Sequence, residues 1–126
     1  MKARLTAAFA ALALAAGVAA PALAHHSFAM FDFQASKSVT GTVEQFDWTN
    51  PHTFIWPQVP TADGKSERYG FEGMSPNFLG RRGWSKETLK PGDKVTVTYH
   101  PLKDGQNGGT YQKVMLSDGK ELMNIG

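Results

Sequence analysis

The stretch that decides the fold is Ser75-Pro76-Asn77-Phe78-Leu79-Gly80-Arg81-Arg82-Gly83. Serine before proline is a typical helix start, because the serine side chain caps free backbone N–H groups and proline suits the first helical turn. The glycine at position 83 is typical of a helix end. The sequence therefore predicts one short helix here, and the segments on both sides of it predict strands.

Five segments with the composition of β-strands surround this helix. Valine and threonine alternate with other residues in several of them, and turns such as Asp63-Gly64 and Pro91-Gly92 separate them. Gly41 lies inside the first strand and indicates a bulge or a sharp bend. The expected strands span residues 38–46, 53–59, 67–71, 94–100 and 110–116.

The order of three strands, one helix and two strands, in a domain of about 100 residues, is the order of an OB-fold. We therefore expect an all-β domain over residues 37–126, a five-stranded OB-fold-like barrel with one short helix between strands 3 and 4. An unrelated β-sandwich or an open β-roll is the alternative. Residues 25–36 contain three phenylalanines and are expected to form an N-terminal arm that packs on the domain.

The first 24 residues have the composition of a cleaved signal peptide. Lys2 and Arg4 precede an apolar run of about 16 residues, and Ala22 and Ala24 stand where a signal peptidase reads small residues. A membrane anchor is one alternative, but a span needs about 20 residues and this run is mostly alanine. A buried helix is another, but the run has no polar face. We expect cleavage before His25 and a periplasmic or secreted protein with no membrane span after processing.

The net charge and the absence of cysteine exclude several classes of function for this chain. Without the two basic residues of the signal, the 13 basic residues fall to 11, equal to the 11 acidic residues. A neutral exported domain lacks the basic surface of a nucleic-acid binder, so no nucleic-acid partner is expected. The chain has no cysteine, which excludes disulfides, thiolate metal sites and thiol nucleophiles.

The four histidines, all outside the signal, are the candidate metal ligands: His25, His26, His52 and His100. Cleavage would free the amine of His25, whose pKa of about 8 lets it bind a metal at neutral pH. This amine and the His25 imidazole would chelate one ion, and another histidine would complete a histidine brace, which suits Cu(II). His52 lies in the loop between strands 1 and 2, and His100 ends strand 4 where it enters the next loop; these loops flank the usual OB cleft, so the two could approach each other.

Each histidine also has an ordinary structural explanation. His25 and His26 could be a solvated remnant of cleavage, His52 a turn residue and His100 a residue at a strand end. Thioethers could hold Cu(I), although methionine more often fills cores; those after the signal are Met30, Met74, Met115 and Met123.

Aromatic residues offer a candidate site without a metal. Trp48 and Trp56, together with Asn50, could form the wall of the OB cleft, although core packing is the ordinary role of tryptophan. Asp47 and Glu72 are isolated carboxylates in apolar surroundings, and the sequence has neither a nucleophile motif nor a phosphate-binding loop. No catalytic residue and no organic cofactor site are expected.

A series of motifs carries a resemblance to a known family. The motifs are His25-His26-Ser27-Phe28, Gly41-Thr42-Val43, Trp48-Thr49-Asn50-Pro51-His52, Gly73-Met74-Ser75-Pro76-Asn77, Arg81-Arg82-Gly83-Trp84, Leu89-Lys90-Pro91-Gly92-Asp93 and His100-Pro101-Leu102-Lys103-Asp104-Gly105. The series resembles a family of small secreted proteins, mainly from proteobacteria, classed as a domain of unknown function. The resemblance implies export and a small β domain, and supplies no activity or substrate. The chain departs from the family at Met74, where glycine is expected.

Three functions follow as expectations. The first is a periplasmic metal-binding protein, a copper carrier or scavenger, with ligands from His25, His26, His52 and His100 and with another periplasmic protein as partner. The second is an OB-type module of the periplasm that binds a non-metal ligand or a protein. The third is a copper-dependent redox enzyme of the histidine-brace type, ranked last because the domain is small for an extended substrate.

Overall fold

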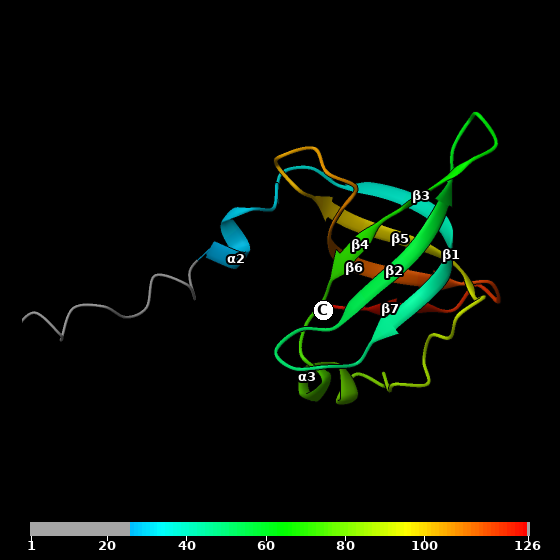
Figure 1. Cartoon of the computed structure of the whole chain (residues 1–126). Coiled ribbons are helices and arrows are strands. Elements are labelled where there is room, and N and C mark those ends of the chain that lie inside the picture. The colour runs from blue at the N-terminus through cyan, green and yellow to red at the C-terminus, as the bar shows by residue number, and fades with distance from the viewer. Residues whose placement is uncertain (1–25, 126) are drawn as a thin grey trace, which may run out of the picture.

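β-Strands dominate the computed structural model, which describes residues 26–125 (Figure 1). Residues 1–25, with the predicted signal peptide and His25, lie outside the described residues, so both the signal and its cleavage site stay predictions. Within the described part of the chain, no helix is both long and apolar enough to cross a membrane. The elements are α2 (His26–Ala29), β1 (Lys37–Asp47), β2 (Phe54–Pro60), β3 (Ser66–Arg68), β4 (Gly70–Glu72), α3 (Pro76–Gly80), β5 (Lys94–Pro101), β6 (Gly108–Leu116) and β7 (Glu121–Met123).

The sheet closes into a barrel because β1 pairs with two neighbours. Residues 37–42 of β1 are antiparallel to β5, and residues 42–47 are antiparallel to β2. β2 pairs with β3 and β4, which together form the third strand; β4 runs parallel to β6, and β6 pairs with β5. This order, with α3 between the third and fourth strands, confirms the predicted five-stranded barrel and is consistent with an OB-like fold.

β1 changes its pairing partner from β5 to β2 near Thr42, and at the preceding Gly41 it comes very close to β2. A Cβ atom at Gly41 would lie 2.6 Å from the backbone oxygen of Gln58 on β2, so a larger residue would push the strands apart. The register between β1 and β2 shifts between Val43 and Gln45, which is a β-bulge. The glycine therefore marks the close approach, and the bulge follows shortly after it.

The helix α3 lies at one end of the barrel (Figure 1). Ser75 caps it by accepting a hydrogen bond from the backbone N–H of Phe78 at 3.3 Å, and Pro76 is its first residue. The helix ends earlier than its sequence predicts, and Gly83 turns the chain with a φ of +87°. This turn places Trp84, which is 3% exposed, in the core.

The sequence does not predict β7, which pairs with β6 in a stretch expected to be a tail. Asn124 holds this end of the chain: its amide Nδ2 donates to the backbone oxygen of Tyr111 at 2.7 Å, and its Oδ1 accepts from the backbone N–H of Met74 at 2.8 Å. A strand of three residues is too short to show an alternating pattern. Its pairing is therefore visible only in the folded chain.

Candidate functional site

Strand register places four side chains in one row on the outer face of the barrel. Phe54 on β2 is paired with Glu72 on β4, Glu72 with Thr110 on β6, and Thr110 with His100 on β5. Directly paired residues on neighbouring strands point to the same side of a sheet. Because Phe71, the neighbour of Glu72, is fully buried inside the barrel, the row faces outward.

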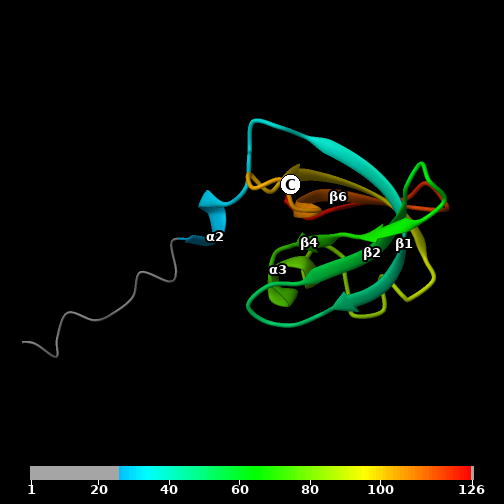
Figure 2. The same ribbon diagram turned by 45° about the horizontal axis from the view of Figure 1, so that its top comes forward.

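The N-terminal arm, residues 26–36, is held by the loop between β5 and β6. The backbone N–H of Lys103 donates to the backbone oxygen of Met30 at 2.9 Å. Phe31 is 4% exposed and forms a β-bridge with Leu102. Figure 2 shows α2 standing to one side of the barrel, near this loop. The arm thus adds a wall beside the outer face of the sheet.

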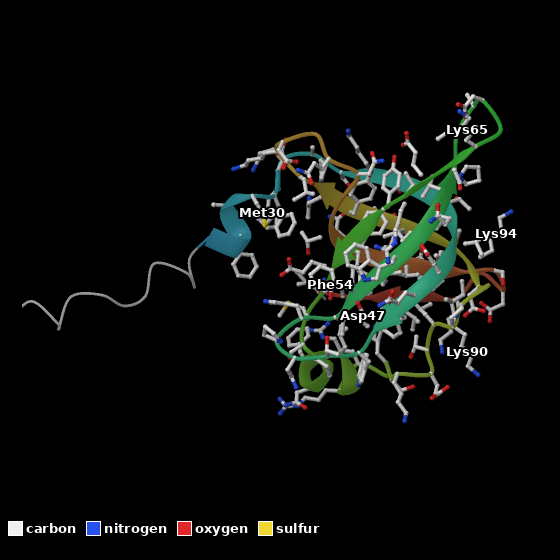
Figure 3. The ribbon with its side chains drawn as sticks, viewed as in Figure 1. Met30, Asp47, Phe54, Lys65, Lys90 and Lys94 are labelled. Atoms are coloured by element: carbon white, nitrogen blue, oxygen red, sulfur yellow. The ribbon has the colours of Figure 1, made fainter. Side chains whose placement is uncertain are left out.

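A cleft of about 290 Å³ lies between the arm and the outer face of β2 and β4. In Figure 3, Met30 is labelled on the arm side of this cleft and Phe54 on the sheet side. A concave, mostly apolar surface with a few polar groups is typical of small-molecule sites. The apolar side chains of this cleft include Met30, Phe31, Phe54, Trp56 and Leu102, and its polar ones are Arg68, Tyr69, Glu72, Gln106 and Asn107.

Trp56 lies on the sheet side of the cleft, and several contacts hold its ring in place. Its indole N–H donates to Asp47 Oδ2 at 2.8 Å, and Phe54 stacks on it with 5.5 Å between ring centroids. The Arg68 guanidinium lies 4.4 Å from the ring centroid. A Cβ atom at Gly70 would lie 2.5 Å from the indole ring, so the ring also needs glycine beside it. Asp47, an isolated carboxylate in the sequence, therefore orients the Trp56 ring.

His52 and Glu72 meet at the end of β4. His52 Nδ1 lies 3.1 Å from the backbone oxygen of Gly73 and 3.5 Å from Glu72 Oε1. A carbonyl oxygen only accepts, so Nδ1 carries the proton and Nε2 keeps a lone pair in the neutral imidazole. Burial raises the pKa of Glu72, and the charge of a protonated His52 opposes this shift. The pair combines a partly buried carboxylate with an imidazole that can still bind through Nε2.

His100 is bonded at both ring nitrogens. Nδ1 donates to the backbone oxygen of Ala35 at 2.7 Å, and Nε2 accepts from the side-chain amide of Gln112 at 2.9 Å. The Gln112 carbonyl accepts in turn from the Ser36 hydroxyl at 2.8 Å, which fixes the direction of the amide. The Phe33 ring packs on the imidazole, with 5.1 Å between centroids. His100 therefore fastens the arm to the barrel and keeps no lone pair for a metal ion in this arrangement.

The other residues predicted for a site lie away from the cleft or outside the described region. His25 is outside the described residues, as is the side chain of His26. Trp48 packs on Phe46 with 5.8 Å between ring centroids, and Asn50 is exposed in the loop between β1 and β2. Among residues 26–125, no three His, Cys, Asp or Glu side chains gather where they could hold a metal ion. The structure thus brings His52 to a carboxylate and leaves His100 in a separate network.

The sequence does not predict the roles of Glu72 and Arg68 in the cleft. Glu72 is an isolated carboxylate along the chain because its neighbours in space come from β2, β6 and the loop that holds His52. Arg68 meets Trp56 because β3 folds back along β2. The one available signal is a charged residue that directly follows the apolar Phe71, which places a carboxylate on the outer face of a short strand.

The closed barrel, with α3 between its third and fourth strands and a cleft on its second and third strands, defines the chain as an OB-like β-barrel protein. Within this class, the chain belongs to a family of unknown function (DUF6152), whose family model matches residues 12–112. This membership confirms the resemblance carried by the motif series to a domain of unknown function. No curated protein and no solved structure matches the chain.

Proposed function

We propose that this protein is a binding module that holds a small ligand in the cleft between its arm and the outer face of β2 and β4. The observation that carries the proposal is the cleft itself, about 290 Å³ in volume and built around Trp56. OB-fold proteins bind their ligands on the face of strands 2 and 3, beside the loops after strands 1 and 4. Here the loop after the fourth strand supplies Leu102, Gln106 and Asn107 to the cleft.

The expected export of the chain makes the periplasm the proposed location of this module. The composition of residues 1–24 supports export, and the neutral charge of the remainder disfavours nucleic acid as the ligand. The cleft is at the small end of the range of ligand sites, which extends from about 300 to 1,000 Å³. It therefore suits a small molecule or one side chain of a larger partner.

Fragment binding to the wild-type protein and to Met30→Ala tests this proposal. Met30 is 45% exposed and lines the cleft, so its truncation leaves the core intact. We expect a bound fragment to shift the Gly70 and Gly109 amide signals in ¹H–¹⁵N NMR spectra. Its dissociation constant should rise about fivefold in Met30→Ala, since about 1 kcal/mol of apolar contact is lost.

The matched control is Met115→Ala, because Met115 is 39% exposed on β6 and lies outside the cleft. It should leave the dissociation constant unchanged. Equal effects of the two truncations, or a fragment library that shifts neither glycine signal, would contradict the proposal.

A second candidate function is the copper carrier or scavenger, and the geometry of His52 favours it. Histidines that bind metals usually donate their other ring N–H to a carbonyl or a carboxylate, and His52 Nδ1 has both partners. The arm begins a few residues before Met30, which lines the same cleft as Glu72. The proposed ligands are the amine and ring of His25 and Nε2 of His52, with His26 as an alternate.

EPR spectroscopy of Cu(II) tests this second candidate on protein purified after export, with its first residue identified by mass spectrometry. We expect nitrogen coordination at micromolar copper, and a loss of affinity of at least about tenfold when one alanine is inserted before His25. His52→Ala should remove one nitrogen from the spectrum. A first residue other than His25, or no copper signal, would overturn it. Oxidation of a reductant by the copper-loaded protein would identify the redox enzyme instead.

A further inference from the structure

Glu72 is a carboxylate that the fold leaves without a full set of donors. Its side chain is 17% exposed, and within the described residues its carboxylate is paired only with His52 Nδ1, at 3.5 Å. That nitrogen also serves the backbone oxygen of Gly73, at the shorter distance of 3.1 Å. Partial burial removes some of the water around this carboxylate, and it raises the pKa of Glu72. A cationic ligand that donates to Glu72 would replace that water with a charge-assisted hydrogen bond.

Two other carboxylates near this face already have two donors each. Asp47 accepts from the Trp56 indole at 2.8 Å and from the Gln45 amide at 2.6 Å. Glu44 accepts from Arg68 Nε at 3.0 Å and from the Gln58 amide at 3.0 Å. Glu72, in contrast, is the one carboxylate among the described residues that line the cleft.

The charged groups that line the cleft do not neutralise Glu72. Arg68 is the one cation among the lining residues that the structure describes, and its guanidinium is committed to Glu44 and to the face of Trp56. The charge that remains is the carboxylate of Glu72, beside the His52 imidazole. The cleft therefore has a negative end that a positively charged ligand would complement.

Aromatic side chains line the same cleft as that negative end. Phe54 is paired directly with Glu72 across β2 and β4, and Phe31 of the arm also lines the cleft. Aromatic faces attract ammonium and guanidinium groups, most strongly where water is excluded. The Arg68 guanidinium over the Trp56 ring is such a contact within this cleft. The Glu72 carboxylate and these aromatic rings together are complementary to a cation with an apolar body.

We infer that the ligand of this cleft is a small organic ammonium compound, with its cationic group at Glu72 and its apolar or aromatic body between Phe54 and the arm. This inference rests on the proposed function of ligand binding and adds the chemical class of the ligand. Neutral molecules of the same shape lose the contact with the carboxylate, and anions are repelled by it.

Three probes of similar size and different charge test the ligand class at pH 7: benzylammonium, benzyl alcohol and benzoate. The readout is the dissociation constant from the Gly70 and Gly109 amide shifts. We expect benzylammonium to bind at least about tenfold more tightly than benzyl alcohol, as a hydrogen bond between charged groups implies. Benzoate should be the weakest. Glu72→Gln should bring the ammonium and the alcohol to within about twofold of each other.

Glu87→Gln is the matched control, because it removes the same charge from an exposed residue outside the cleft. It should leave the preference for benzylammonium unchanged. If benzyl alcohol binds as tightly as benzylammonium and Glu72→Gln has no effect, the inference is overturned and the proposed binding function stands. If none of the probes and no other fragment binds, both are overturned.

Discussion

Trp84→Ala is expected to lower the free energy of unfolding by about 3–5 kcal/mol, the range for a large buried aromatic residue. Trp84 is 3% exposed and packs on Phe46 and Tyr111, with ring centroids 6.2 and 5.8 Å away. Its indole N–H also donates to the backbone oxygen of Met123 at 3.1 Å. The substitution therefore removes core packing and a tether of β7 together. Urea denaturation, followed by circular dichroism, measures the change.

Trp48→Ala is the matched control for this prediction. Trp48 packs on the same Phe46 but is only partly buried at the edge of the core. We expect a smaller loss of about 1–2 kcal/mol, with a similar dependence on urea concentration in both variants. Equal losses for the two tryptophans would show that Trp84 does not have the central place in the core that the structure gives it.

His100→Ala is expected to release the N-terminal arm and weaken the cleft. The substitution removes the partners of the Ala35 carbonyl and the Gln112 amide, both partly buried, at no more than about 1–3 kcal/mol for each. The arm carries Met30 and Phe31, which line the cleft. Hydrogen exchange of the Asp32 and Lys103 amides, which donate across the contact between the arm and the loop after β5, should become faster, and the affinity for a cleft ligand should fall.

His52 and His100 form a matched pair for this experiment. His52→Ala should leave hydrogen exchange in the arm unchanged and remove a nitrogen from any Cu(II) spectrum, whereas His100→Ala should do the reverse. If His100→Ala instead removes copper coordination and leaves the arm protected, His100 is a metal ligand, as the sequence predicts, and not the anchor of the arm.

The positions of the histidines along the chain do not predict whether their ring nitrogens are free to bind a metal ion. The fold puts His52 in the loop after β1, as expected, and His100 within the last residues of β5, next to the loop that follows this strand. The loop of His52 bonds to residues 73–74 after β4, while the loop after β5 bonds to Gly70 at the start of β4. The loops thus flank the outer face from opposite ends of β4. Which ring nitrogen each imidazole keeps for a ligand depends on contacts that no spacing in the sequence reveals.

The succession of strands along the chain, the capped helix after Ser75 and an irregularity of the first strand near Gly41 were determined by the sequence itself. Each depends on alternation, a cap or a missing Cβ atom within a few residues, which local physics reads directly. The cleft was decided only by tertiary structure. Glu72 meets Thr110, 38 residues away, because β4 and β6 pair in parallel, and His100 meets Ala35 across 65 residues. Such contacts arise when the barrel closes, since closure alone sets the register between distant strands.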